Sequence, residues 1–125
     1  ICVDDEVTVL ESLEIELQKA FKNQYQYEFA ESADEALEVI EELVKDNVKI
    51  VVIVSDWLMP GMKGDELLIL IHQRFPEVTT ILLTGQADRE AVERAINEAK
   101  IYAYLTKPWN TKELIETIRS GISKS

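Results

Sequence analysis

The sequence alternates short apolar runs with longer amphipathic segments five times, and this alternation constrains the fold more than any other feature. The runs that predict strands cover residues 1–3, 25–30, 50–55, 79–83 and 101–105. The segments that predict helices cover residues 7–21, 32–45, 64–75, 88–99 and 110–120. Strict strand–helix alternation with short connections favours a parallel sheet with helices on both faces. The expected class is therefore α/β.

Local signals mark where several of the predicted helices begin. Ser32 and Glu35 form a capping box at the start of the second helix, and Asn110 and Glu113 form another at the start of the fifth. Asp88 is expected to cap the fourth helix. These signals place the helices between the predicted strands over the whole chain.

The length and the net charge limit the functions that such a chain can have. The 125 residues suit one domain, residues 1–125, and no linker or repeat divides them. A net charge of −11 disfavours direct binding to nucleic acid or to an anionic membrane. No apolar run is long enough to cross a membrane, and Cys2 has no disulfide partner in the chain, which together point to the cytoplasm. Because the first residue is not Met and the first strand is short, we expect a segment excised from a longer chain or slightly truncated at its N-terminus.

Acidic residues end two of the predicted strands. Asp56 follows the central apolar run, residues 50–55, and Asp4 and Asp5 follow the first run. The carboxyl ends of parallel strands meet at one edge of the sheet, where the functional crevice of such folds lies. Three carboxylates at that edge repel one another unless a cation or a proton joins them. Asp4 and Asp5 alone would be interpreted as helix caps, but their coincidence with Asp56 favours a cation site.

The chemistry of these side chains indicates which cation is expected. Carboxylates that are few in number and open to solvent suit Mg²⁺, which keeps several of its waters. The backbone carbonyl of Leu58, in the turn after Asp56, is a candidate further ligand. Zinc is not expected, because His72 lies within a predicted helix and Cys2 within a predicted strand.

Two more polar side chains are expected at the same edge of the sheet. Thr84 follows the fourth predicted strand, and Lys107 follows the fifth. The Lys107 ammonium can pair with Asp56 or with an oxygen bound to it, and the Thr84 hydroxyl is a donor. A metal ion, an ammonium and a hydroxyl around one carboxylate form a cradle for a phosphoryl group attached to that carboxylate. Such a site acts by charge neutralisation and positioning.

Four segments at the strand ends together resemble the receiver domain of two-component response regulators. They are Val3-Asp4-Asp5-Glu6, Asp56-Trp57-Leu58-Met59-Pro60-Gly61-Met62-Lys63-Gly64, Leu83-Thr84-Gly85 and Tyr104-Leu105-Thr106-Lys107-Pro108-Trp109. The resemblance covers essentially the whole chain. It implies a flavodoxin-like (βα)5 fold, which is a three-layer sandwich whose five-stranded parallel sheet has the strand order 2-1-3-4-5.

The resemblance also implies a role for each residue of the acidic edge. Asp56 would accept a phosphoryl group from the phosphohistidine of a sensor histidine kinase or phosphotransfer protein, in a reaction that requires Mg²⁺. Asp5 would bind the metal directly, Asp4 would bind it through water, and Leu58 would contribute only its carbonyl oxygen. Lys107 would bind the phosphoryl oxygens, and the Lys107-Pro108 peptide bond is expected to be cis.

The same resemblance implies a conformational switch. Thr84 would move toward the phosphoryl oxygens, and Tyr104 would rotate inward. The face made by the fourth helix, fifth strand and fifth helix would then change, and it would control an output domain or partner or mediate a homodimer. The domain is not expected to be a stand-alone enzyme, although it would catalyse its own phosphorylation and slow dephosphorylation.

Two positions depart from the family pattern. The family usually has a glycine before the fifth strand, where this chain has Asn97-Glu98-Ala99-Lys100-Ile101. The residue after Pro108 is Trp109 rather than the more frequent phenylalanine. The first departure means that the conformation of the turn before the fifth strand is not predicted. It does not affect the residues of the expected site.

Two other functions remain as alternatives. A small phosphohydrolase with an aspartyl nucleophile generally carries a second aspartate two residues later, where this chain has Leu58. An interaction module that has lost phosphorylation would not need the complete set of Asp5, Asp56, Thr84 and Lys107. The phosphorylatable receiver is therefore the favoured hypothesis.

Overall fold

A parallel sheet forms the centre of the molecule in a computed structural model that describes residues 1–85 and 89–123. Its strands are β1 (Cys2–Val3), β2 (Phe29–Ala30), β3 (Val52–Asp56), β4 (Thr79–Thr84) and β5 (Ala103–Thr106). These five strands are arranged in the order β2-β1-β3-β4-β5, and every pair is parallel. The strand order predicted from the sequence is confirmed.

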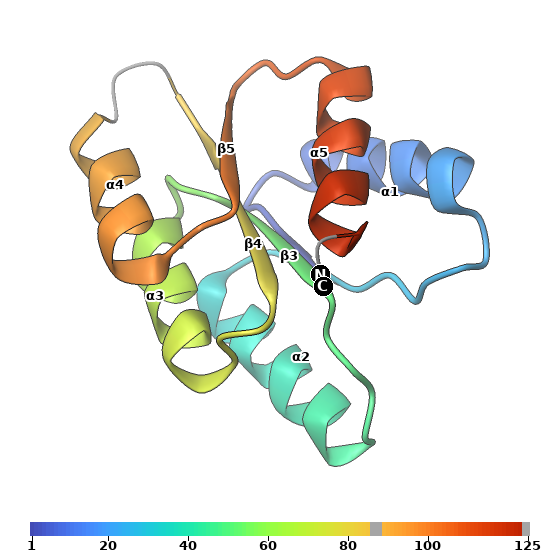
Figure 1. The fold of residues 1–125 in the computed structure, drawn as a ribbon, viewed down its shortest axis with the longest axis horizontal. Helices are drawn as coiled ribbons and strands as arrows, with labels where there is room; N and C mark the ends of the chain where they lie inside the picture. Colours follow the sequence, from blue (N-terminus) through green and yellow to red (C-terminus); the bar gives the residue numbers. More distant parts are fainter. Residues whose placement is uncertain (86–88, 124–125) are drawn as a thin grey trace.

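Helices cover both faces of the sheet. They are α1 (Val7–Phe21), α2 (Ala33–Lys45), α3 (Gly64–Arg74), α4 (Arg89–Arg94), the π-helical segment η1 (Ala95–Ala99) and α5 (Thr111–Ser123). Helices α1 and α5 lie on one side, and α2, α3 and α4 lie on the other (Figure 1). The molecule is therefore a three-layer α/β sandwich of the flavodoxin-like class.

The central strand β3 is buried on both faces, as its apolar sequence predicts. Ile53 packs into the core beneath α2 and α3, whereas its neighbour Val54 packs into the core beneath α1 and α5. Both side chains are at most 2% exposed. Alternate residues of a strand point to opposite faces, so a strand between two helical layers must be apolar at consecutive positions. This packing on both faces fixes the position of β3 and therefore of Asp56 at its end.

Several element ends differ from the sequence prediction. The strand predicted at residues 25–30 is only Phe29–Ala30, because β2 is an edge strand and pairs with β1 alone. The strand predicted at 50–55 is Val52–Asp56, so Asp56 is its last residue rather than the residue after it. The fifth strand, predicted at 101–105, is Ala103–Thr106, in register with Ile81–Thr84 of β4.

The helix starts agree with the predicted caps where the structure describes them. The Ser32 hydroxyl accepts a hydrogen bond from the Glu35 N–H at 3.1 Å, and the Asn110 side chain accepts one from the Glu113 N–H at 3.2 Å. The cap predicted at Asp88 lies outside the described residues. None of the helices within residues 1–85 and 89–123 combines the length and apolar character that a membrane span requires.

The fourth helix ends without the glycine that the family usually has before the fifth strand. The α-helix widens into the π-helical segment η1, and Lys100 then adopts the left-handed conformation at φ 51° and ψ 45°. Its N–H donates to the carbonyl of Ala95, which closes the wide turn. A residue with a Cβ therefore occupies a backbone conformation that glycine adopts at lower cost.

Candidate functional site

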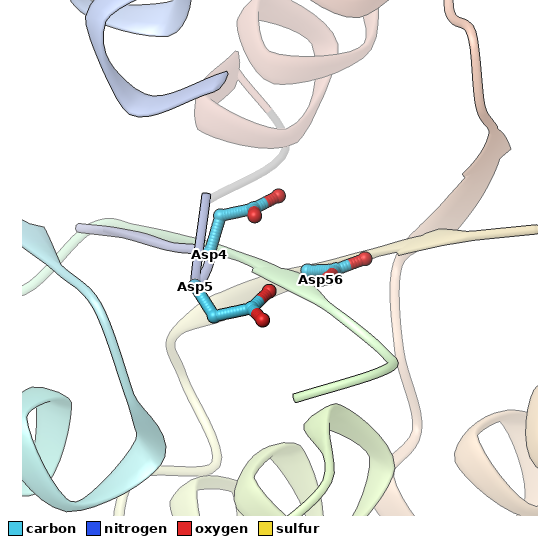
Figure 2. A group of neighbouring side chains, drawn as sticks. All are labelled: Asp4, Asp5 and Asp56. Carbon is cyan, nitrogen blue, oxygen red and sulfur yellow. The ribbon is translucent and has the colours of Figure 1, made fainter. Parts of the chain in front are cut away.

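The acidic edge assembles at the carboxyl ends of β1 and β3. Asp4, Asp5 and Asp56, hereafter the acidic trio, each offer one carboxylate oxygen, and these atoms all lie within 4.8 Å of one another. Figure 2 shows the three carboxyl groups turned to the same side of the sheet edge. Asp4 and Asp56 are buried, whereas Asp5 is exposed. The residues predicted to hold a cation are therefore brought together, with one of them open to solvent.

Asp4 is fixed by hydrogen bonds. Its N–H donates to the Ala30 carbonyl at 3.1 Å, and its Oδ1 accepts from the Glu6 N–H at 2.9 Å. Helix α1 begins after Glu6 without a side-chain cap. Asp4 thus accepts from the N–H of the N-cap residue of α1, and Glu6 itself makes no side-chain cap bond.

Lys107 brings a positive charge to the trio from the loop between β5 and α5. Its Nζ lies 3.0 Å from Asp4 Oδ2 and 2.9 Å from Asp56 Oδ1. Its backbone N–H donates to the Thr84 carbonyl at 2.8 Å, which ties the loop to the end of β4. The Lys107-Pro108 peptide bond is cis, as predicted. Burial acts to lower the pKa of Lys107, but its hydrogen bonds to Asp56 and Asp4, together with the negative charges of these two residues, raise that pKa.

The surroundings of Asp56 raise the pKa of its carboxyl in the absence of a metal ion. Burial raises the pKa of the Asp56 carboxyl most strongly, and the hydrogen bond from Lys107 opposes this effect. The negative charges of Asp4 and Asp5 raise the pKa further. A divalent cation among these oxygens would reverse the balance, because positive charge stabilises the ionised carboxylates.

The donor set of the trio matches the preference of Mg²⁺. All its ligand atoms are carboxylate oxygens, and the exposed Asp5 leaves a side on which water can complete the coordination. A soft metal that requires thiolate or imidazole ligands does not match this set. Leu58 lies two residues after Asp56. Its hydrocarbon side chain has no ligand atom, so only its backbone carbonyl is a candidate ligand.

The loop after Asp56 is held close to the strand by its backbone. The Trp57 N–H donates to the Leu83 carbonyl, and the Trp57 carbonyl accepts from the Gly64 N–H, both at 2.8 Å. A Cβ on Gly64 would lie 2.1 Å from the Asp56 carbonyl oxygen, so only glycine permits this approach. Gly61, with φ of 78°, makes the turn between them. The role of Gly64 was not predicted from the sequence, because the close approach of the Asp56 carbonyl exists only in the folded chain.

The predicted switch residues lie on the two neighbouring strands. Thr84 ends β4 as a buried residue, and its hydroxyl donates to the Gly85 carbonyl at 3.2 Å. It lies one residue beyond Leu83, which pairs with Asp56 in the sheet register. Tyr104 on β5 is 48% exposed. The structure thus places Thr84 beside the acidic edge and Tyr104 with its ring partly in solvent.

Sequence reasoning missed one charged residue close to this site. Asp65, in the first turn of α3, is only 3% exposed and accepts a hydrogen bond from the Trp57 indole N–H at 3.1 Å. The only signal in the sequence was an acid two residues before the apolar helical run that begins at Leu67. An acid at that position of a helix is usually solvated, so the pattern alone gave no reason to single it out.

Known proteins are similar to this chain in sequence and in fold. The family model for the response regulator receiver domain matches residues 1–119. The hydrogenase transcriptional regulatory protein HoxA of Cupriavidus necator is 36% identical over 120 residues, which are 96% of this chain and 23% of that protein. The sensor kinase CckA of Brucella abortus is 33% identical over 95 residues, which are 76% of this chain and 10% of that protein. The chain thus spans less than a quarter of the length of these curated relatives.

A solved structure extends the similarity to the backbone. The signal receiver domain of an HD domain-containing protein from Pseudomonas fluorescens Pf-5 superposes with a TM-score of 0.87 at 34% identity. The superposition covers 98% of this chain and 92% of that chain. The family match over residues 1–119, the strand order and the acidic edge lead to one conclusion. The chain belongs to the receiver domain family of two-component response regulators.

Proposed function

We propose that this receiver domain is a phosphoacceptor switch in which Asp56 takes a phosphoryl group in a Mg²⁺-dependent reaction. The observation that carries the proposal is the environment of Asp56 at the end of β3. Oxygens of the acidic trio lie within 4.8 Å of one another, and Lys107 Nζ lies 2.9 Å from Asp56 Oδ1. The donor would be the phosphohistidine of a sensor histidine kinase or phosphotransfer protein.

The proposed transfer uses Asp56 as the nucleophile. One carboxylate oxygen of Asp56 attacks the phosphorus atom, and the bond from phosphorus to the donor imidazole nitrogen breaks. The imidazole keeps the electron pair of that bond and takes a proton from solvent. Mg²⁺ held by the acidic trio would supply positive charge against the transferring phosphoryl oxygens. Lys107 pairs with those oxygens, and Thr84 donates its hydroxyl to them.

The proposed output passes through Thr84 and Tyr104. As the Thr84 hydroxyl turns to the phosphoryl group, the Tyr104 ring rotates from its partly exposed position toward the space that Thr84 leaves. This rotation changes the face formed by α4, β5 and α5. The 48% exposure of Tyr104 supports the proposal, because the ring starts outside the core. A partner, an output domain of the same chain or a second copy would read this face.

The domain would act as a signalling module rather than as a stand-alone enzyme. It would catalyse its own phosphorylation and slow dephosphorylation in the cytoplasm. The relatives that it matches are a transcriptional regulatory protein and a sensor kinase, and both are much longer than this chain. These relatives support the proposal of an output or kinase module attached to the domain.

Acetyl phosphate tests the proposed function without a known kinase. Incubation with acetyl phosphate and Mg²⁺ is expected to add one phosphoryl mass to the intact protein. Chelation of the metal and the substitution Asp56→Asn should each prevent the addition. Absence of an adduct with acetyl phosphate and with a phosphohistidine donor would refute the proposal. Multiple-turnover hydrolysis of an ordinary phosphate monoester would instead favour a phosphohydrolase.

A further inference from the structure

A buried acid outside the acidic trio contacts the loop that follows the phosphoacceptor. Asp65 is the second residue of α3 and is 3% exposed. Its Oδ1 accepts from the Trp57 indole N–H at 3.1 Å, and its Oδ2 lies 3.4 Å from Arg94 Nη1. A buried carboxylate normally requires such partners, because an unpaired charge is costly to remove from water. Each carboxylate oxygen of Asp65 therefore has its own partner, the Trp57 indole for one and Arg94 for the other.

The hydrogen bond to Trp57 restrains the residue next to the phosphoacceptor. The Trp57 backbone is already held on one side by the Leu83 carbonyl and on the other by the Gly64 N–H. The indole bond to Asp65 restrains the direction of the side chain. The residue that follows Trp57 is Leu58, whose carbonyl is the candidate metal ligand. A restraint on Trp57 thus acts one residue away from each of two groups of the site.

Arg94 fixes the orientation of the Asp65 carboxylate. It is the last residue of α4, where the helix widens into η1, and its Nε also donates to Glu98 at 3.1 Å. Its guanidinium is thereby held on one side by Glu98 and on the other by Asp65. The contacts run without a break from Trp57 through Asp65 to Arg94.

A role for Asp65 in α3 alone does not explain these contacts. Lys63 is the N-cap of α3 and makes no side-chain cap hydrogen bond. Asp34 occupies the equivalent second position of α2 and is exposed. A favourable interaction with the positive end of the helix needs only an exposed acid such as Asp34. The burial of Asp65 is therefore associated with Trp57 and Arg94.

We propose that Asp65 is a positioning residue for the metal- and phosphoryl-binding loop: by holding the Trp57 indole it restrains the direction of that side chain and, through it, the position of the Leu58 carbonyl beside Asp56. The inference rests on the proposed function, because its effect is exerted on metal binding at the acidic trio. Residues that orient metal ligands from the outer layer commonly contribute roughly tenfold or more to metal affinity.

The test measures metal binding directly in the 125-residue chain. Mn²⁺ serves as the probe, because it binds the same oxygen ligands as Mg²⁺ and its free concentration is read by electron paramagnetic resonance. Asp65→Ala is expected to weaken Mn²⁺ binding by roughly tenfold. The matched control Asp34→Ala removes the same charge from the same position of a neighbouring helix, and it should leave Mn²⁺ binding within about twofold of the wild type. Urea unfolding of each variant separates loss of binding from loss of fold.

Two further variants test the indole bond itself. Trp57→Phe removes the donor, and it should weaken Mn²⁺ binding as much as Asp65→Ala does. The double variant should be no weaker than either single variant, because both remove one interaction. Asp65→Asn keeps an oxygen acceptor for the indole and should retain most of the Mn²⁺ affinity. If Asp65→Ala does not fold, the Mn²⁺ affinities of Trp57→Phe and Asp65→Asn are compared instead. Weaker binding in Trp57→Phe alone would support the positioning role, and equal binding in the two variants would refute it.

The outcomes separate this inference from the proposed function. If the wild type binds Mn²⁺ and Asp65→Ala binds it as tightly as Asp34→Ala does, the positioning role is refuted and the proposed function stands. Additive effects of Asp65→Ala and Trp57→Phe would refute the positioning role in the same way. If the wild type binds neither Mn²⁺ nor a phosphoryl group, the proposed function fails and the inference fails with it.

Discussion

At the residue scale, opposing effects of burial, hydrogen bonding and neighbouring charge act on the pKa values of Asp56 and Lys107. Burial raises the pKa of Asp56, the hydrogen bond from Lys107 lowers it, and the charges of Asp4 and Asp5 raise it further. The hydrogen bonds and charge interactions with Asp56 and Asp4 raise the pKa of Lys107 although burial opposes them. One ammonium therefore serves two buried carboxylates, so a change in the charge of any of these groups should alter both stability and metal binding.

The raised pKa of Asp56 predicts that Asp56→Asn stabilises the metal-free fold. Between the ordinary pKa of 3.8 and the raised native pKa, the native state holds more protons than the unfolded state. The stability of the wild type therefore falls as the pH rises through this window, and above the window the ionised Asp56 is destabilising. Asn carries no such charge. Urea unfolding with a chelator should show the variant to be more stable at neutral pH.

The pH dependence provides the control for this prediction. The advantage of Asp56→Asn over the wild type should shrink as the pH falls through the window, because the wild-type carboxyl then becomes neutral too. An advantage that is independent of pH, or a variant less stable than the wild type at neutral pH, would contradict the proposed charge balance at Asp56.

Removal of Lys107 should have the opposite effect on stability. Lys107→Met leaves Asp4 Oδ2 and Asp56 Oδ1 without their shared cation. The expected loss in the free energy of unfolding is about 1–3 kcal/mol, the typical cost of an unsatisfied buried group. Added Mg²⁺ should recover more stability in this variant than in the wild type, because the metal then replaces the missing positive charge.

An exposed lysine serves as the control for this substitution. Lys112 lies in the first turn of α5 and is exposed. Lys112→Met should change the free energy of unfolding by less than about 0.5 kcal/mol, as surface substitutions usually do. Equal losses in the two variants would show that Lys107 has no special role in balancing the trio.

The sequence revealed the residues whose chemistry depends on their place after a strand. The acidic trio and Lys107 follow apolar runs, and the parallel sheet alone brings such ends together. Asp65 was not predicted, because its burial exists only once Trp57 and Arg94 fold against it. The amino-acid sequence does not show in which direction the Trp57 indole points.

At the element scale, the positions of strands and helices followed from periodicity, but their ends did not. The strand β2 is shorter than its apolar sequence suggests, since an edge strand has a hydrogen-bonding partner on one side only. The π-helical end of the fourth helix was not predicted either. It arises where the chain must reach β5 without a glycine, and Lys100 takes the left-handed conformation instead.

This conformation predicts that Lys100→Gly stabilises the domain. A residue with a Cβ in the left-handed region costs roughly 1–2 kcal/mol, whereas the greater freedom of glycine in the unfolded chain offsets about 0.4–1 kcal/mol of the gain. The expected net increase in the free energy of unfolding is about 0.5–1 kcal/mol, measured by urea unfolding. Lys100→Ala keeps the Cβ and should give no such increase. A gain of equal size in the alanine variant would rule out relief of backbone strain as the cause.

At the scale of the whole molecule, the fold converts distant sequence positions into one site. Asp4 and Lys107 are 103 residues apart, yet their side chains meet at 3.0 Å, because β1 and β5 both end at the same edge of a parallel sheet. The strand order places β3 at the centre, between β1 and β4. Asp56 therefore has carboxylates from one neighbouring strand and Thr84 from the other. The family resemblance predicted this order, which alternation alone leaves open.

The central claim is that Asp56, and neither of its acidic neighbours, accepts the phosphoryl group. Reaction with acetyl phosphate and Mg²⁺, followed by borohydride reduction, converts a phosphorylated aspartate into homoserine. Peptide mass spectrometry then identifies the residue that was converted. We predict homoserine at position 56 alone, in a yield that requires Mg²⁺. Homoserine at position 4 or 5, or an unmodified position 56 after full reaction, would contradict this claim.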